Sequence, residues 1–298
     1  DAVTIPLMPE DPQYHDYNSI EIKNVDTLLK IREGRHPHSR DVSVTYYELL
    51  KHIKEKGFKG KVILVNHQLS HAAYAYHYSG YKETDVLSYD GAGCGWPPEV
   101  IVGYNVKNHT YRKVFSYRVP HSLGHIYSNT TNVIFGPNAD GKEGKTMGLA
   151  PYGTPMEDYK MLEYDPNEKM FKATYPSSSK IPYDGIQPYM SRLGLRQSKI
   201  KQREKYKKWD LESEEDKFYA NLAATVQKSI EDAGYYYAQK LKSATGEKNL
   251  CMTGGVALNS CLNGLIKRNK LYNNVFAPPA CHDGGHGLGG PLYYCNSK

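Results

Sequence analysis

Two histidines, His67 and His71, have a spacing that could support metal chemistry. Four positions apart in a helix, their imidazoles lie on one face, close enough to bind a single metal ion. The chain contains 12 histidines, so such a pair also arises by chance, and surface or core histidines are the alternative. The spacing alone leaves both interpretations open.

Asp90 ends an apolar segment at 85–90 and is followed by Gly91 and Gly93. A carboxylate at the end of a strand can lie beside a metal or a phosphate, and glycines let backbone N–H groups approach an anion. A plain tight turn is the alternative. This segment is a second candidate for metal or phosphate binding.

Two glycine-rich segments near the C-terminus could also approach a ligand. The first lies between a predicted strand and the start of a helix, and together these form a surface large enough for a nucleotide to approach. The second lies at the start of the C-terminal helix. Glycines inside a helix each cost about 1 kcal/mol relative to alanine, a cost tolerated where a ligand or another helix needs the space. The candidate residues are Gly254, Gly255, Asn259, Gly284 and Gly285, with Asp283 as a possible carboxylate ligand or base.

Lys145 lies in the segment GKEGKTMGLAPYG (141–153), which superficially resembles a phosphate-binding loop. The pattern GxxxxGK[ST] requires a glycine where Asn138 stands. We therefore reject a loop of that class.

Strands and helices alternate through most of the chain. Short apolar segments predict strands at 61–65, 85–90, 100–106, 111–119, 249–253 and 275–277. Periodic segments predict helices at 43–56, 67–79 behind a cap at Asn66, 122–135, from 211 onward, 256–269 and at the C-terminus. The alternation predicts an α/β fold with ligand-binding turns at strand ends.

The domain organisation follows from composition. The first 40 residues are rich in proline, histidine and polar residues, which predicts a surface segment, and 151–210 predicts an insertion of mixed structure. We divide the chain into an N-terminal segment at 1–60 and a core at 61–298 with an inserted region at about 151–210.

The net charge of +6 is confined to one stretch. Residues 196–208 carry seven basic side chains and one acidic one, and five carboxylates follow by 216, which predicts a solvated loop. We therefore expect no nucleic-acid partner, with a patch for phosphate-bearing partners as the alternative.

No apolar run approaches the roughly 20 residues that span a bilayer, and five cysteines without CxxC spacing indicate reduced thiols. These features predict a cytoplasmic protein without a membrane partner.

Six segments, in order, resemble the motifs of one family, the O-carbamoyltransferases of nodulation-factor and antibiotic biosynthesis. They are VNHQLSHAAYAY, SYDGAG, HSLGHIYS, EGKTMGLAPYG, TGGVALN and HDGGHGLGG, over about 67–290. The resemblance implies an actin- and hexokinase-like ATPase core, with mixed sheets flanked by helices, that is shared with the tRNA threonylcarbamoyl-transfer proteins.

The resemblance also implies a mononuclear metal beside a nucleotide. It assigns Fe(II) or a similar divalent metal to His67, His71, Asp90 and Asp283. Imidazoles and carboxylates suit such a borderline metal. The residues expected to bind ATP or carbamoyl-adenylate are Gly91, Gly93, Gly254, Gly255, Asn259, Gly284 and Gly285.

The implied reaction has two steps. A YrdC-like domain makes carbamoyl-adenylate from carbamoyl phosphate and ATP, and the core transfers the carbamoyl group to the hydroxyl of a small acceptor. Lys145 would face the phosphate or the carbamoyl group. His121 and Asp140 are candidates for the base that takes the hydroxyl proton, with a helix start and a loop turn as the respective alternatives.

Two departures from the family pattern matter. The N-terminal hairpin that forms the first phosphate-binding turn is not recognisable, and no segment resembles the YrdC-like half. Besides transfer, two alternatives therefore stand: an incomplete metal- and nucleotide-binding module that acts with a partner, and a relative of the tRNA-modifying branch.

Overall fold

The computed structural model describes residues 2–5, 18–22, 50–93, 98–119, 121–136, 139, 141–157, 161–173 and 209–296. The basic stretch at 196–208, Asp140 and most of the inserted region at 151–210 lie outside these residues. Of the helix predicted at 43–56, the part from Leu50 is described, and it is helical to residue 55.

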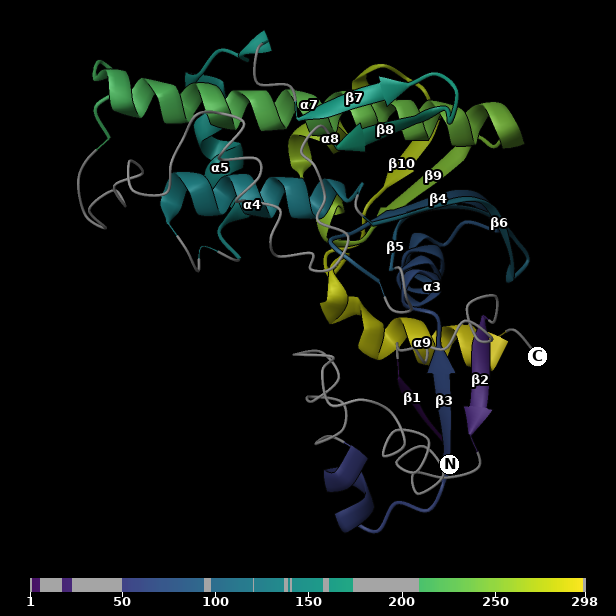
Figure 1. Ribbon diagram of the computed structural model, residues 1–298. Helices are drawn as coiled ribbons and strands as arrows, with labels where there is room; N and C mark the ends of the chain where they lie inside the picture. The colour runs from purple at the N-terminus through teal and green to yellow at the C-terminus, as the bar shows by residue number, and fades with distance from the viewer. Residues whose placement is uncertain are drawn as a thin grey trace.

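A five-stranded mixed sheet forms the centre of the fold (Figure 1). In spatial order its strands are β10 (Asn274–Phe276), β9 (Asn249–Thr253), β4 (Glu83–Tyr89), β5 (Glu99–Lys107) and β6 (Thr110–Arg118). β4, β5 and β6 form an antiparallel meander that contains the predicted hairpin, whereas β9 runs parallel to β4 and β10 parallel to β9. β4 and β5 are buried along almost their whole length, which explains their apolar runs.

Helices cover both faces of this sheet (Figure 1). On one face lies α3 (His67–Ser79), and on the other lie α7 (Glu214–Thr245), α4 (Leu123–Phe135) and α8 (Ser260–Arg268). Each face has its own hydrophobic core. The predicted α/β fold, with mixed sheets flanked by helices, is confirmed.

The long helix α7 forms where apolar residues recur every three or four positions. Leu222, Val226 and Ile230 from this stripe are buried against the sheet. Ser213 caps the helix through its Oγ, which accepts a hydrogen bond from the Asp216 N–H at 3.3 Å. The helix ends at Gly246, whose φ of 71° suits a residue without a Cβ.

A second, three-stranded sheet uses residues from the N-terminal segment. Its order is β1 (Ala2–Ile5), β3 (Lys61–Val65) and β2 (Ser19–Ile22), with β1 parallel and β2 antiparallel to β3. Ile5 and Ile22 are buried. The expectation of a surface segment is therefore wrong for these two strands, because β3 needs partners on both edges; the domain boundary at 60 stays a prediction.

The remaining elements are short, apart from the C-terminal helix. They are α5 (Glu143–Leu149), η2 (Ala150–Tyr152), the hairpin of β7 (Leu162–Asp165) and β8 (Met170–Ala173), η4 (Gly255–Leu258), η5 (Asp283–Gly285) and α9 (His286–Asn296). The helix predicted at 256–269 begins only at Ser260, because Asn259 caps it and the preceding residues form a 3₁₀ turn. α9 packs along α3, on the side of α3 that faces away from the five-stranded sheet (Figure 1).

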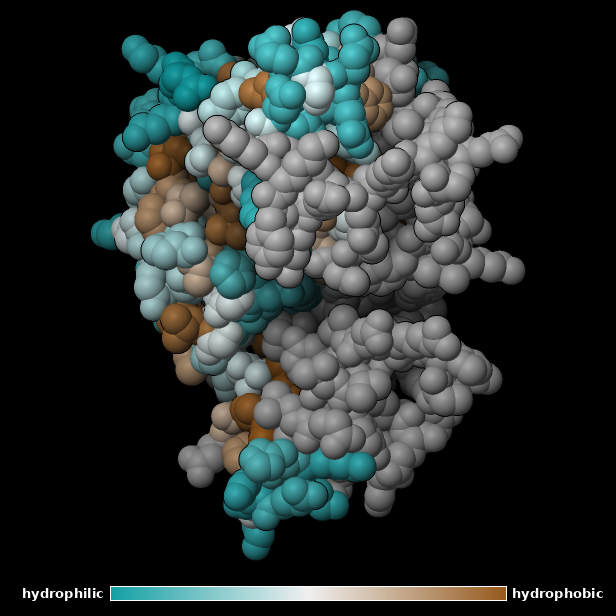
Figure 2. Space-filling model, turned by 90° about the vertical axis from the view of Figure 1, so that its left-hand side faces the viewer, coloured by the Kyte–Doolittle hydropathy of each residue, from teal (hydrophilic) through white to brown (hydrophobic). Residues whose placement is uncertain are grey.

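The surface shown in Figure 2 carries hydrophobic groups interleaved with hydrophilic ones. The large apolar side chains exposed in the described residues are Tyr78, Tyr152, Tyr164, Leu258 and Leu288. Among the helices described, none is both long and apolar enough to cross a membrane.

Candidate metal centre and nucleotide-binding turns

His67 and His71 lie in the first turns of α3, which follows directly on the buried strand β3. Asn66 caps this helix, because its Oδ1 accepts a hydrogen bond from the Leu69 N–H at 3.0 Å. The four-residue spacing places both imidazoles on one helical face, and both side chains are buried. The predicted helix and its cap are therefore confirmed.

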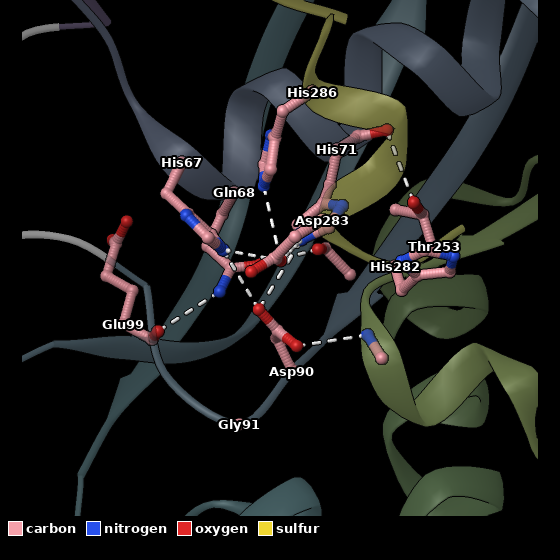
Figure 3. Close-up of polar contacts among 12 residues, drawn as sticks. His67, Gln68, His71, Asp90, Gly91, Glu99, Thr253, His282, Asp283 and His286 are labelled. Carbon is pink, nitrogen blue, oxygen red and sulfur yellow. Dashed lines mark hydrogen bonds and ion pairs between the residues drawn. The ribbon is translucent and has the colours of Figure 1, made fainter. Parts of the chain in front are cut away.

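Asp90 reaches the two histidines from the end of β4 (Figure 3). Its Oδ2 lies 2.9 Å from His67 Nε2 and 3.4 Å from His71 Nε2. Its Oδ1 accepts a hydrogen bond from the Gly255 N–H at 3.0 Å. This contact exists because β4 and β9 are parallel neighbours, so that their C-terminal ends meet at one edge of the sheet.

Asp283 brings a second carboxylate to the same point from η5. Its Oδ1 lies 3.5 Å from His67 Nε2 and 3.3 Å from His71 Nε2. His286, the first residue of α9, adds a third imidazole, with Nε2 at 3.4 Å from Asp283 Oδ1. Sequence reasoning missed His286, although its spacing of three positions from Asp283 in a helix opening was a usable signal.

The donor atoms of this cluster lie at distances that suit one metal ion. Ligand atoms about 2.1 Å from an ion are about 3.0 Å apart at a right angle and about 3.4 Å apart at a tetrahedral angle. The nitrogen–oxygen distances in the cluster run from 2.9 to 3.5 Å. One ligand atom from each of His67, His71, Asp283 and His286 lies within 4.8 Å of the others. The geometry therefore fits a metal centre.

The pKa values of the cluster show how strongly these groups interact. Burial lowers the pKa of His71, but contacts with Asp283 and Asp90 outweigh burial and raise it to about 9. Asp90 is buried whereas the Asp283 side chain is 70% exposed, and the histidines hold the pKa of each carboxylate below its usual range. Burial lowers the pKa of His286 to about 3, against the influence of Asp283. A cation binds ionised carboxylates and deprotonated imidazoles, so a metal ion would have to displace the proton that the raised pKa leaves on His71.

A buried carboxylate supports the first turn of α3 from β5. Asn66 Nδ2 donates a hydrogen bond to Glu99 Oε2 at 3.1 Å, while Lys113 and Ser116 donate to Oε1 at 2.8 and 2.7 Å. Burial would raise the pKa of Glu99, but the Lys113 charge and these hydrogen bonds lower it. Glu99 thus helps to hold Asn66, the cap residue next to His67, in place.

Three of the glycines predicted to bind nucleotide surround Asp90. Gly254 has a φ of 84°, and a Cβ there would lie 2.2 Å from the Tyr89 carbonyl oxygen, so glycine is required. The Gly255 N–H donates a hydrogen bond to Asp90, and Gly91 is the residue directly after Asp90 in the chain. The turns after β4 and β9 therefore lie together at the cluster of histidines and carboxylates.

The other predicted glycines have structural contacts of their own. The Gly93 N–H donates to the Glu99 carbonyl at 2.7 Å. A Cβ at Gly285 would lie 2.5 Å from the Ala280 carbonyl oxygen, so close packing accounts for this glycine. Gly284 is exposed on the same turn as Asp283.

Asn259 uses its side chain inside the protein. Its Oδ1 accepts a hydrogen bond from the Leu262 N–H at 2.9 Å, which caps α8. Its amide also pairs with the amide of Gln227, at 2.9 and 3.0 Å. These contacts orient α8 against α7, and a nucleotide-binding role for Asn259 stays a prediction.

Two of the predicted catalytic residues, Lys145 and His121, are described, and both lie apart from the histidine cluster. Lys145 is exposed on α5, and His121 Nδ1 accepts a hydrogen bond from the Ala173 N–H at 3.3 Å, toward β8. Within the described residues, neither forms a hydrogen bond or ion pair with the histidine cluster. Asp140 lies outside these residues, and all three roles stay predictions.

A second histidine that sequence reasoning missed lies beside the Asp90–Gly91 turn. A Cβ on Gly91 would lie 3.5 Å from His125 Cδ2. Burial lowers the pKa of His125, and the Asp90 charge only partly opposes this, so the imidazole is neutral at pH 7. Ser122 holds the turn from the start of α4, because its hydroxyl lies 2.6 Å from the Gly91 carbonyl oxygen.

The chain belongs to the family described as Carbamoyltransferase N-terminus, which matches residues 17–292. It is 29% identical over 239 residues to nodulation protein NolNO of Sinorhizobium fredii, covering 79% of this chain and 32% of the relative. It is 29% identical over 228 residues to nodulation protein NolO of Bradyrhizobium diazoefficiens, covering 76% and 38%. The chain thus spans about a third of the length of these relatives.

Among solved structures, the chain is similar to full-length HypF in a phosphate- and nucleotide-bound form. The TM-score is 0.46 at 14% identity, over 87% of this chain and 45% of that one.

Proposed function

We propose that this chain transfers a carbamoyl group from carbamoyl-adenylate to the hydroxyl of a small acceptor, at a site that binds one divalent metal and the nucleotide. The observation that carries the proposal is the cluster of imidazoles and carboxylates at the end of β4, beside the glycine turns, in a chain of the carbamoyltransferase family.

The metal ligands of the proposal are His67, His71, Asp90 and Asp283. Their nitrogen and oxygen atoms suit Fe(II) or a similar ion. A bound metal would supply a Lewis acid that polarises the carbamoyl carbonyl group. Asp90 has a second task, because its Oδ1 holds the Gly255 N–H and so fixes the nucleotide turn against the metal ligands.

The reaction forms a bond between the acceptor oxygen and the carbamoyl carbon, and breaks the bond from that carbon to the phosphate oxygen of AMP. AMP leaves as an anion, so the binding turns must stabilise negative charge. The N–H groups of Gly93, Gly254 and Gly255 already donate to Glu99, Cys281 and Asp90, so these glycines would serve by letting the phosphate approach the backbone closely. Lys145 would add a positive charge when the nucleotide is bound.

A base must take the proton of the acceptor hydroxyl. His121 and Asp140 stay candidates from the sequence. His125 is better supported than His121, since it lies beside Gly91 and its lowered pKa leaves a neutral imidazole that can accept a proton. The released proton would thus pass to His125 near the metal site.

Carbamoyl-adenylate would come from a YrdC-like domain that acts on carbamoyl phosphate and ATP. We further propose that the partners are small molecules, since the excess basic charge is confined to 196–208 and is followed by carboxylates. Binding to transfer RNA below 1 µM at about 200 mM salt would instead support the tRNA-modifying alternative, because non-specific phosphate contacts weaken steeply with salt.

The test is a transfer assay with purified chain, a separate YrdC-like domain, ATP, Fe(II), labelled carbamoyl phosphate and a panel of hydroxylated metabolites and nucleosides. We expect labelled product from the parent, at least 100-fold less from Asp90→Asn, and an unchanged yield from Asp232→Asn. Asp232 is a matched control, because it is an exposed carboxylate paired with Lys228. Metal and ATP binding without product on any acceptor would favour the incomplete binding module.

A further inference from the structure

We infer that His286 is a ligand of the same metal, so that the centre holds three imidazoles, from His67, His71 and His286, beside its carboxylates. The inference rests on the metal centre of the proposed function and changes its composition. In the motif HDGGHGLGG, which carries the family resemblance, His286 stands at a position that the resemblance does not assign to the metal.

The position of the imidazole is the first argument. The ring centroid of His286 lies 4.3 Å from that of His67 and 4.1 Å from that of His71 (Figure 3). Its Nε2 lies 3.4 Å from Asp283 Oδ1, about the spacing of two atoms bound to one ion and longer than an ordinary hydrogen bond. His286 thus faces the same point as the other donors.

The unsatisfied nitrogens are the second argument. The side chain is only 6% exposed, Nδ1 has no hydrogen-bond partner among the described residues, and Nε2 has only the long 3.4 Å contact with Asp283. A buried polar atom without a partner is costly, so native proteins pair such atoms with another group or with an ion. Coordination by Nε2 would satisfy one nitrogen of His286.

The packing of α9 on α3 is the third argument. A Cβ at Gly289 would lie 2.0 Å from the Ser70 carbonyl oxygen, so the two helices touch through backbone atoms. This contact is three residues beyond His286 on α9 and one residue before His71 on α3. The close approach of the helices therefore fixes His286 against the other imidazoles.

A third imidazole changes which metals the centre prefers. Nitrogen-rich donor sets favour Fe²⁺, Co²⁺, Ni²⁺ and Zn²⁺, whereas Mg²⁺ and Mn²⁺ prefer sets made of oxygen. His286 should therefore widen the difference in affinity between Co²⁺ and Mn²⁺. Replacement of His286 by an apolar residue should narrow this difference.

The first measurement is a Co²⁺ titration of three metal-free proteins: the parent, His286→Leu and His77→Leu. Visible absorption monitors binding, and competition with a chelator gives the affinity. His77 is a matched control, because it also has a buried, unpartnered ring nitrogen but lies at the other end of α3. We expect one Co²⁺ per parent chain, an affinity about 100-fold lower in His286→Leu, and no change in His77→Leu. Mn²⁺ affinity should fall less than Co²⁺ affinity in His286→Leu.

A second measurement uses the unaltered protein, so it does not depend on how a variant folds. Proton NMR of the Co²⁺-loaded parent in water should show three exchangeable, strongly shifted imidazole N–H signals. Two signals, or an unchanged Co²⁺ affinity in a folded His286→Leu, would overturn the inference while the metal centre of the proposed function stands. A parent chain that binds no Co²⁺, Fe²⁺ or Zn²⁺ would overturn both.

Discussion

Replacement of Asn66 by alanine should loosen the turn that presents the first metal ligand. The Asn66 side chain makes two contacts at once: Oδ1 caps α3 through the Leu69 N–H, and Nδ2 donates to the buried carboxylate of Glu99. Alanine removes both contacts and leaves His67 in an uncapped first turn. The change should therefore lower both the stability of the fold and the affinity of the metal centre.

The magnitude follows from the two contacts. Loss of an N-cap costs about 1 kcal/mol, and loss of a hydrogen bond to a charged group costs about 1.5–3 kcal/mol. Glu99 keeps the hydrogen bonds from Lys113 and Ser116, which limits the second cost. We expect Asn66→Ala to lower the free energy of unfolding by about 2–4 kcal/mol.

The assay is urea unfolding of the metal-free protein, followed by Co²⁺ titration under native conditions. Ser213→Ala is the control, because Ser213 caps a different helix, α7. It should cost about 1 kcal/mol and leave Co²⁺ affinity unchanged. Asn66→Ser keeps a cap oxygen without the amide donor and should fall between the parent and Asn66→Ala.

Two results would refute this reasoning. One is a loss of stability in Asn66→Ala no larger than that in Ser213→Ala, which would mean that the Glu99 contact contributes nothing. The other is an unchanged Co²⁺ affinity in Asn66→Ala, which would mean that the cap does not position His67.

Three further changes test other parts of the structure. Gly255→Val should abolish ATP binding in calorimetry, because a Cβ at this position would lie 3.0 Å from Asp90 Oδ1. Its circular dichroism should stay native, and an unchanged ATP affinity would refute the role of this turn in nucleotide binding. The pKa of Glu99 is lower in the folded protein than its value near 4.5 in the unfolded chain, so ionised Glu99 stabilises the fold at a pH above 4.5. This stabilisation is lost as the pH falls through the pKa of the folded state. Glu99→Gln should therefore flatten the acid side of the stability profile in urea melts, whereas Glu83→Gln, at an exposed pair, should leave that side as steep as in the parent. Tyr272→Phe should cost about 1.5–3 kcal/mol in the same melts, because the hydroxyl donates to the buried Asp85 carboxylate at 2.8 Å, and a cost near zero would contradict that role.

Several features could be predicted from the sequence because local rules govern them. The cap at Asn66, the four-residue spacing of His67 and His71, and the apolar stripe of α7 each depend on neighbours within a few positions. The hairpin of β5 and β6 is local in the same sense. The spacing of apolar residues along a helix or strand reflects contacts between residues a few positions apart, and these predictions are confirmed.

The resemblance to a family predicted which distant residues share a site, which the helical and strand periods of the sequence cannot predict. His67, His71, Asp90 and Asp283 come from three separate motifs, and the structure brings them together. The resemblance did not assign a role to His125 or include His286, because both stand at positions that its motifs leave open.

Only the tertiary structure decided which side chains share one space. β1 and β2 pair with the two edges of β3, and each buries one isoleucine, although their own sequences suggested a surface. His286 meets His71, more than 200 positions earlier, because α9 rests on α3 through the backbone at Gly289. Local sequence determined the caps and helix faces named above, since these depend on nearby residues, whereas the packing of distant elements brought together the histidines and carboxylates of the candidate metal centre.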